Sequence, residues 1–303
     1  MDNLKRLLII DCNAVIHRAY HALPPLTTKK GEIINAVYGF LLVFLKTVRE
    51  LDPAFIAAVF DYPAPTFRHK EYRDYKANRP PTPEGLISQM SKTKEILNSF
   101  NIPIYVKEGY EADDIIGTIA RTVTEKERSG TEVVILSGDL DTLQLVSPFV
   151  KVYFLRKGVK DTFLYDEALV KEKYQGLDIR QLVDLRALRG DPSDNIPGVR
   201  GIGEKTAIAL IRNFGNLDDL YRALENNYEK AAEIKQSVKE MLFNQKEQAF
   251  MSRSLASIDR NVEIEFDLGK CEWQKTYDRQ SAAKALEAFE FYSLISKLPD
   301  FKI

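Results

Sequence analysis

Short apolar runs alternate with longer amphipathic stretches along the first half of the chain. The spacing of apolar residues predicts helices at Asn35–Leu51, Pro83–Asn98, Glu111–Val123 and Asp141–Val146. Runs with strand character lie at Arg6–Asp11, Ala54–Asp61, Ile102–Val106, Glu132–Asp139 and Lys151–Leu155. Strands that are apolar throughout and alternate with helices are typical of a parallel sheet covered on both faces. The pattern therefore predicts an α/β core.

The second half of the chain has a different pattern. After about Tyr174 no further strand pattern is found, and the remainder predicts helices separated by the turn sequences GDPSDNIPGVRGIG and NFGNLDD. We therefore expect two parts, an α/β part at residues 1–175 and a helical part at residues 176–303.

Acidic residues follow several of the predicted strands. Asp11 and Asp61 close the first two strands, and Asp139 and Asp141 follow the fourth. A single aspartate after a strand is most often a turn or helix-cap residue. Repetition at successive strands weakens that explanation, because the carboxyl ends of parallel strands meet at one edge, where ligands bind. We expect these acids to converge there.

Three more acids stand in GYEADDIIG, at the start of a predicted helix. Acids in a first turn interact favourably with the helix dipole, which is the simpler explanation. Glu111 and Asp114 are three residues apart and share a helix face. Asp113 joins them only if Glu111 precedes the first turn, which the periodicity leaves open.

Two aspartates before a glycine-rich turn complete a set of nine acids. So many carboxylates cannot ionise together in one pocket without cations. Oxygen ligands without His or Cys select hard ions such as Mg²⁺ or Mn²⁺, and two such ions suit in-line displacement at a phosphodiester. With the nine set aside, the formal charge of −1 becomes +8, which is compatible with a nucleic-acid partner. The predicted metal ligands are Asp11, Asp61, Glu111, Asp113, Asp114, Asp139, Asp141, Asp191 and Asp194.

A basic and aromatic segment, Thr66–Leu86, follows Asp61. Its spacing favours a helix with charged and aromatic side chains on one side. A solvated amphipathic helix is the alternative to a phosphate clamp with stacking surfaces. Its position beside the acidic edge favours DNA binding, and the residues concerned are Phe67, Arg68, Lys70, Tyr72, Arg73, Tyr75, Lys76 and Arg79.

The turn Gly198–Gly203 resembles a phosphate-binding P-loop with one residue out of place. Glu204 stands where that loop has its lysine, and the Lys205–Thr206 pair comes one residue late. The preceding segment also predicts a helix, not a strand. A helix–hairpin–helix fits better, with amides at the start of the second helix binding a DNA phosphate. The residues predicted to do so are Gly198, Gly201, Gly203, Lys205 and Thr206.

The two cysteines, Cys12 and Cys271, cannot build a disulfide framework, which favours a reducing cytoplasm. The longest early apolar run, Leu7–Ile10, is too short for a signal peptide, and we expect no membrane association.

Four blocks of the sequence resemble one family. FDYPAPTFRHKEYRDYKANRPPTPEGL, GYEADDIIGTIA, SGDLDTLQLV and GDPSDNIPGVRGIGEKTA are similar to the signature blocks of the 5′-nuclease domain of bacterial DNA polymerase I and its free-standing and phage flap-endonuclease relatives. The similarity runs nearly end to end, from LLIIDCNAVIHRAYHAL to ALEAFEFYSLISKL.

The resemblance implies a PIN-like parallel-sheet core with a helical arch over residues 66–100. It also implies a helical part with a helix-three-turn-helix at about residues 178–213. The implied activity is Mg²⁺-dependent 5′–3′ exonuclease and flap-endonuclease cleavage in replication and repair, leaving a 5′-phosphate and a 3′-hydroxyl. Mn²⁺ is expected to substitute for Mg²⁺, and the hairpin to hold K⁺.

The resemblance also implies individual roles. Lys76 and Arg79 would stabilise charge on the phosphate in the transition state, and Arg18 and Tyr75 would position DNA near the scissile bond. Asp11, Asp61, Glu111, Asp113 and Asp139 would surround the first metal, and Asp139, Asp141 and Asp194 the second. Asp114 and Asp191 would act through water.

The expected partners are DNA with 5′ flaps, nicks or gaps and RNA–DNA hybrids. A monomer in the bacterial nucleoid, linked to or working with a DNA polymerase, is expected. Three departures bear on substrate preference: Leu140 replaces a basic residue, Pro192 replaces a small polar one, and YPAP after Asp61 is unusual.

Two rival functions are weaker. ILSGDLDT resembles the D-x-D-x-T motif of haloacid-dehalogenase-type phosphatases, but that function leaves Asp11 and Asp61 unexplained. A non-catalytic DNA-structure-binding protein on the same fold predicts lost carboxylates, and none of the nine is missing.

Overall fold

The computed structural model describes residues 4–126 and 130–301. The chain forms two compact units, each built from separate segments. Unit 1 comprises Met1–Ala64, Pro81–Asp166 and Asp259–Ile303, and unit 2 comprises Pro65–Pro80 and Glu167–Ile258. The division into residues 1–175 and 176–303 stays a prediction.

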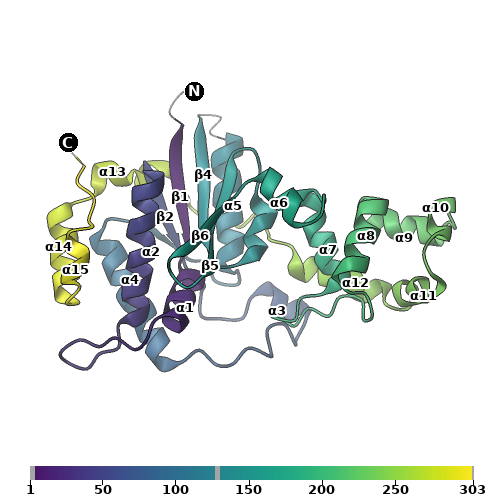
Figure 1. Cartoon of the computed structure of the whole chain (residues 1–303), viewed down its shortest axis with the longest axis horizontal. Coiled ribbons are helices and arrows are strands. Elements are labelled where there is room, and N and C mark those ends of the chain that lie inside the picture. Colours follow the sequence, from purple (N-terminus) through teal and green to yellow (C-terminus); the bar gives the residue numbers. More distant parts are fainter. Residues whose placement is uncertain (1–3, 127–129, 302–303) are drawn as a thin grey trace. The chain divides into compact units, whose positions relative to one another are not determined.

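Unit 1 is built on one six-stranded sheet in the order β3-β2-β1-β4-β5-β6. Figure 1 labels all of these strands except β3. The strands are β1 (Lys5–Asp11), β2 (Phe55–Val59), β3 (Ile104–Tyr105), β4 (Thr131–Ser137), β5 (Val150–Lys157) and β6 (Asp161–Tyr165). Neighbouring strands pair in parallel except β5 and β6, which are antiparallel. The five predicted strands and the α/β core are confirmed, whereas β6 was not predicted.

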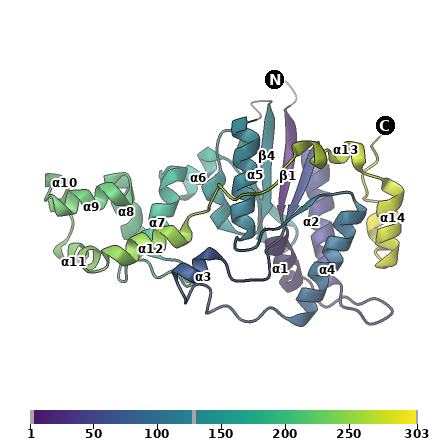
Figure 2. The same ribbon diagram turned by 180° about the vertical axis from the view of Figure 1, so that it is seen from behind.

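Helices cover both faces of this sheet because its strands are apolar on both faces. Leu8 and Ile10 of β1 pack in one core with α1 (Cys12–Ala22), α2 (Asn35–Leu51) and α4 (Glu84–Ser99). The alternate residues Leu7 and Ile9 are equally buried and point to the other face. Helix α5 (Ala112–Lys126) covers that face (Figure 2). Of these helices, only α1 was not predicted.

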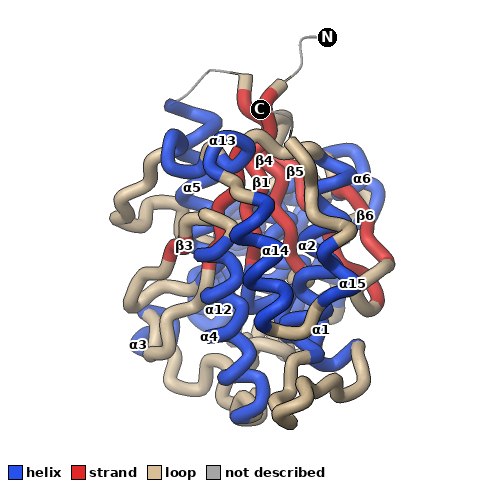
Figure 3. Tube along the Cα trace, turned by 90° about the vertical axis from the view of Figure 1, so that its left-hand side faces the viewer, coloured by secondary structure: helices blue, strands red, loops and turns tan. Residues whose placement is uncertain are grey.

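The C-terminal segment completes unit 1. It contains η3 (Leu268–Cys271), α13 (Trp273–Thr276), α14 (Arg279–Ala288) and α15 (Tyr292–Ile295). Helix α14 packs on α4 (Figure 3), and the buried indole of Trp273 donates to the carbonyl of Phe100 over 2.9 Å.

Unit 2 is helical. Its elements are α3 (Phe67–Glu71), α6 (Glu167–Lys173), η2 (Ile179–Gln181), α7 (Leu182–Arg189), α8 (Glu204–Phe214), α9 (Leu217–Glu225), α10 (Glu229–Ala232), α11 (Gln236–Asn244) and α12 (Lys246–Ala256). Apolar faces of α7, α8, α9 and α12 share one core. The predicted helix–hairpin–helix is confirmed as α7, a glycine-rich hairpin and α8.

Among the helices of residues 4–126 and 130–301, none combines the length and apolar character that crossing a membrane requires.

Candidate metal site and nucleic-acid interface

The first cluster of acids lies in unit 1, where β1 and β4 end side by side. Asp11 is the last residue of β1 and caps α1, its Oδ1 accepting from the amide of Ala14 at 3.0 Å. Its Oδ2 accepts from the hydroxyl of Ser137, the last residue of β4, at 2.7 Å. The adjacent parallel strands therefore bring the two carboxyl ends into direct contact.

The loop after β4 carries two more acids. Asp139 caps the 3₁₀ helix η1 (Leu140–Leu145), and its Oδ1 accepts from the amide of Asp141 at 2.8 Å. The amide of Asp139 donates to the hydroxyl of Ser137 at 3.0 Å. Ser137 thus connects Asp11 to the Asp139 loop.

Asp61 lies beyond β2 at the start of α5. Its Oδ1 accepts from the amide of Ala112 at 2.8 Å, and its own amide donates to the side chain of Asn13 at 3.1 Å. Helix α5 begins at Ala112, so Glu111 precedes it. The sequence left open whether Glu111 precedes the helix. In the structure it does, and this start allows Asp113 to face the other acids.

Burial and the charges of neighbouring acids both disfavour ionisation of the acids of unit 1. Burial raises the pKa of Asp11 to about 7, and the charges of Asp61 and Asp139 add to this shift. Burial, followed by the charges of Asp11, Asp139 and other nearby acids, raises the pKa of Asp113 well above its ordinary value. Two of those other acids are Asp141 and Glu111. A multivalent cation would relieve this repulsion, so the donor set fits a divalent metal ion.

The described acids of unit 1 do not form a closed metal-binding cage. Among the described residues, no group of three or more His, Cys, Asp or Glu side chains is already arranged to hold a metal ion. Instead, several carboxylate oxygens accept hydrogen bonds from nearby amides and from Ser137.

Asp114 has a different environment from its neighbour Asp113. Its side chain is fully buried, with Oδ2 accepting from the amide of Glu111 at 3.1 Å and Oδ1 from the amide of Asp259 at 2.8 Å. Both oxygens therefore bind backbone of unit 1.

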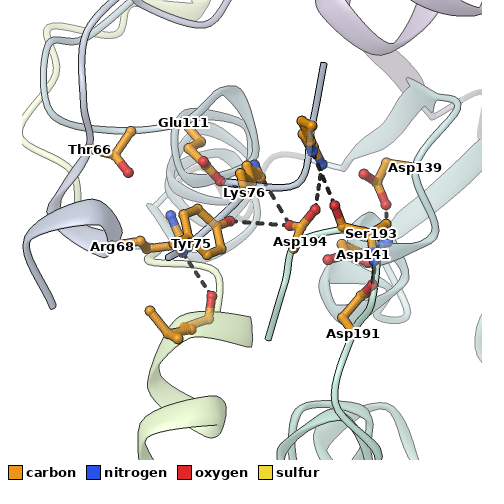
Figure 4. Close-up of polar contacts among 12 residues, drawn as sticks. Thr66, Arg68, Tyr75, Lys76, Glu111, Asp139, Asp141, Asp191, Ser193 and Asp194 are labelled. Atoms are coloured by element: carbon orange, nitrogen blue, oxygen red, sulfur yellow. Dashed lines mark hydrogen bonds and ion pairs between the residues drawn. The ribbon is translucent and has the colours of Figure 1, made fainter. Parts of the chain in front are cut away.

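The second pair of acids lies in the hairpin of unit 2. The buried Asp191 forms an ion pair with Arg186 at 2.6 Å through Oδ2. Its Oδ1 accepts from the amide of Ser193 at 2.9 Å and from the hydroxyl of that residue at 2.6 Å (Figure 4). Asp194 accepts from the hydroxyl of Tyr75 at 3.2 Å and lies 3.7 Å from Nζ of Lys76; it also pairs with Arg79.

The basic segment of unit 2 is not the long helix that its spacing favoured. Helix α3 ends at Glu71, and the chain then turns, with Lys76 at φ +57°. The turn forms because the amide of Lys76 donates to the carbonyl of Asp194 at 2.9 Å, and Asn195 donates to the carbonyl of Asp74 at 2.7 Å. Residues distant in sequence override the local helical spacing.

The predicted DNA contacts in this segment have different exposures. Arg68 is buried, and its guanidinium donates to the carbonyls of Leu255 at 2.9 Å and Ser257 at 2.6 Å. Tyr75 is also buried, whereas Lys70 and Arg73 are exposed. The predicted arch over residues 66–100 consists of α3, a turn-rich stretch in both units and α4, whose Leu86 and Leu97 belong to the core of unit 1.

The hairpin glycines fall into two groups. Gly198 has φ +60°, and a Cβ there would lie 2.2 Å from the amide nitrogen of Gly190. Its amide donates to the buried hydroxyl of Ser252 at 3.0 Å, so this amide is already used in a hydrogen bond inside unit 2. Gly201 and Gly203 are exposed, and Gly203 caps α8.

The remaining predicted contacts lie at helix surfaces. Lys205 and Thr206 lie in the first turn of α8 and line a pocket of about 450 Å³ together with Phe214 and Ile234. Arg18 of α1 donates to the carbonyl of Gly138, beside Asp139, over 2.9 Å.

Four supporting residues were not predicted: Asn13, Ser137, Arg186 and Ser193. Three of them had a positional signal: Asn13 and Ser137 lie two residues from the acids Asp11 and Asp139, and Ser193 lies between Asp191 and Asp194. Arg186 had no such signal, because only the fold of α7 brings it to Asp191.

Acidic oxygens gathered where parallel strands end, together with a helix–hairpin–helix, define the class of metal-dependent nucleases that act on DNA. Two family models match the chain: the 5′–3′ exonuclease N-terminal resolvase-like domain over residues 6–175, and the 5′–3′ exonuclease C-terminal SAM fold over residues 177–279. The chain therefore belongs to the 5′–3′ exonuclease family.

Its curated relatives include DNA polymerase I of Bacillus caldotenax, 41% identical over 295 residues, covering 97% of this chain and 32% of the relative. The thermostable DNA polymerase I of Thermus thermophilus is 39% identical over 290 residues, covering 96% of this chain and 32% of the relative. The chain thus spans about a third of the length of these relatives.

Solved structures share the fold. A 5′-exonuclease of phage T5 with bound zinc has a TM-score of 0.68 at 20% identity, with 95% of this chain and 100% of that one covered. The catalytic core of Rad2 in complex with DNA has a TM-score of 0.56 at 17% identity, with 97% and 93% covered.

Proposed function

We propose that this chain is a Mg²⁺-dependent 5′-nuclease that removes nucleotides from 5′ ends and cuts 5′ flaps of duplex DNA. The observation that carries the proposal is the convergence of acids where the parallel strands of unit 1 end, with Asp11 and the Asp139 loop joined through Ser137. Burial, and after it the charges of neighbouring acids, raises the pKa of both Asp11 and Asp113. Carboxylates buried close together destabilise the folded protein when they ionise, unless a bound cation balances their charge. Family membership identifies the reaction class.

The ions would be held by the unit 1 acids Asp11, Asp61, Glu111, Asp113, Asp139 and Asp141. The ligand roles of Asp191 and Asp194 stay predictions. When bound, the ions would activate water near neutral pH and stabilise charge on the phosphodiester. Mg²⁺ is proposed because the donors are all oxygens, and Mn²⁺ accepts the same donors.

The protein's own residues would orient the substrate. Lys76 and Arg79 both form ion pairs with Asp194. On DNA binding they would leave these pairs, and their positive charge would compensate the negative charge of the phosphate. The amides of the exposed residues Gly201 and Gly203 would contact a phosphate of the duplex, and K⁺ at this hairpin would assist them. Arg18 would act from beside the Asp139 loop.

The cellular setting forms part of the same proposal. The curated relatives are DNA polymerases, so we propose that the nuclease works with or is joined to a polymerase in the bacterial cytoplasm. Its substrates there would be flaps, nicks, gaps and RNA–DNA hybrids.

Cleavage of a 5′-labelled flap duplex tests the proposal. We expect cutting near the flap junction with Mg²⁺, none with EDTA, and a loss on the order of 10³-fold in Asp139→Asn. Asp52→Asn is the matched control, because Asp52 ends α2 in the left-handed region, which Asn also tolerates, and it should retain full activity. Binding of the flap without cutting in Mg²⁺ or Mn²⁺ would instead establish the non-catalytic DNA-structure-binding alternative.

A further inference from the structure

One face of α5 holds the segment Asp259–Val262, with which the chain re-enters unit 1. The amide of Asp259 donates to Oδ1 of Asp114 at 2.8 Å. One helical turn further, the hydroxyl of Thr118 accepts from the buried amide of Val262 at 3.1 Å and donates to the carbonyl of Asp114 at 2.8 Å. Arg121, on the next turn, donates to the side chain of Asn261. The residues i, i+4 and i+7 of one helix thus form a continuous anchor.

Asp114 also closes the loop before the helix. Its second oxygen, Oδ2, accepts from the amide of Glu111 at 3.1 Å. The side chain has no exposed surface, so both oxygens bind backbone in the interior of unit 1. A buried carboxylate held by two amides is fixed in one orientation, because losing either bond would leave a buried polar group unsatisfied.

Asp113 provides the contrast on the same helix turn. Successive residues of a helix are separated by about 100° around its axis, so the two carboxylates cannot face the same way. Asp113 is half-buried and interacts electrostatically with Asp11, Asp139 and the other acids of the cluster. Asp114 is directed to Asp259 and the amide of Glu111.

We propose that Asp114 is a positioning residue and not a metal ligand: it anchors Asp259–Val262 on α5 and fixes the backbone of Glu111. The ligand role suggested by its place in the acidic motif belongs to Asp113. Glu111 is presented to the acidic cluster only while its amide is held, so Asp114 acts on the site through Glu111.

The first measurement is backbone amide exchange by NMR on the full chain without metal. In Asp114→Asn, the amide group keeps the shape of the side chain but turns one acceptor into a donor. We expect exchange at Asp259 to accelerate at least about tenfold. Asp113→Asn, the matched control, should leave the exchange rate of Asp259 within about twofold.

The second measurement counts Mn²⁺ bound by electron paramagnetic resonance. Asp114→Asn should bind as many ions as the wild type, with affinity reduced about 10-fold because Glu111 is less well held. Asp113→Asn should lose affinity more strongly or lose an ion. This measurement rests on the proposed metal-dependent function, whereas the exchange measurement does not. A wild type that binds no Mn²⁺ therefore contradicts the proposed function, and the exchange of Asp259 still decides the anchor.

Thr118 supplies a milder pair of variants in case Asp114→Asn does not fold. Thr118→Val removes the hydroxyl at nearly constant volume and should accelerate exchange at Val262 and Asp259, whereas Thr118→Ser retains the hydroxyl and should restore protection. Loss of one bound ion in Asp114→Asn, or unchanged exchange at Asp259 in that variant, would overturn the proposal. If that variant cannot be measured, equal protection of Val262 in the Val and Ser variants would overturn it.

Discussion

The acids of unit 1 and those of unit 2 come from similar motifs but have opposite surroundings. In unit 1, the charges that shift the pKa of Asp113 are those of other acids. In unit 2, Asp191 faces Arg186, and Asp194 faces Lys76 and Arg79. A cation would relieve the repulsion among the carboxylates of unit 1, whereas the carboxylates of unit 2 are paired with basic side chains of the protein. The difference teaches that the acidic residues of one motif set need not share one role.

The two settings should affect stability in opposite directions. The metal-free protein should become more stable when an acid of unit 1 is neutralised, and less stable when the balance in unit 2 is disturbed.

The largest expected effect is in unit 2. Arg186→Met should cost about 3–5 kcal/mol in the free energy of unfolding, because it leaves the buried charge of Asp191 without its guanidinium. Side chains of the pair are only 9% and 12% exposed, so water cannot replace the lost partner. Urea denaturation measures the loss.

Arg189→Met is the control for Arg186→Met. Arg189 is on the same helix and pairs with Glu204, whose side chain is 55% exposed, so its loss should cost less than about 1 kcal/mol. Equal losses of stability in the two variants would mean that the buried pair Arg186–Asp191 contributes no more than the exposed pair Arg189–Glu204.

The next prediction concerns the backbone conformation of the hairpin that carries Asp191, which should depend on a glycine at position 198. Gly198→Ala should destabilise by about 3 kcal/mol, because φ is +60° and the Cβ would lie 2.2 Å from the amide nitrogen of Gly190. Gly203→Ala should stay within about 0.5 kcal/mol, because φ is −86° and no atom lies within 4 Å of the new Cβ. A thermal melt of both variants decides the matter; a tolerant Gly198 would show that the hairpin can relax.

These contrasts bear on what the sequence can predict. Strands such as β1 and β4 follow from their own apolar runs, so their ends, and the acids there, could be located without the structure. Strand β6 escaped prediction because a short edge strand with an exposed Leu164 has a weak pattern. Helix α1 had a readable signal, since Cys12, Val15, Ile16 and Ala19 share one face, and it was missed.

The candidate site was less predictable because it depends on contacts distant in sequence. Whether Asp113 or Asp114 faces the acids depends on a helix start placed to within one residue, which periodicity does not resolve. Arg68 and Tyr75 appeared to be surface groups of a helix, but their partners are at Leu255 and Asp194, more than a hundred residues away. Spacing within a segment holds no information on such partners.

The third effect is a pH dependence on the unit 1 side. The pKa of Asp11 is about 7 in the folded protein, against an ordinary 3.8, so the folded state holds its proton more tightly. The stabilisation is complete below about pH 4 and is lost as the pH rises through 7. Asp11→Asn cannot ionise, so without metal its stability relative to the wild type should rise by about 2 kcal/mol between pH 5.5 and 7.5.

At pH 7.5, saturating Mg²⁺ should make the wild type more stable than Asp11→Asn, because only the wild type has the full set of proposed metal ligands. Denaturation at both pH values, with Mg²⁺ and with EDTA, measures all four combinations. A difference independent of pH and metal would show that Asp11 is a cap of α1 and nothing more.

The smallest effect concerns Ser137, which connects the acids of β1 and β4. Ser137→Ala removes a hydrogen bond that lowers the pKa of Asp11 and an acceptor for the amide of Asp139. Mn²⁺ affinity should fall about 10- to 100-fold with the number of ions unchanged, as expected for a group that orients ligands. Ser99→Ala is the control, because the hydroxyl of Ser99 donates only to a carbonyl of its own helix and should leave metal affinity unchanged. If Ser137→Ala binds Mn²⁺ as tightly as the wild type, the hydroxyl of Ser137 is not needed to orient the acids of unit 1.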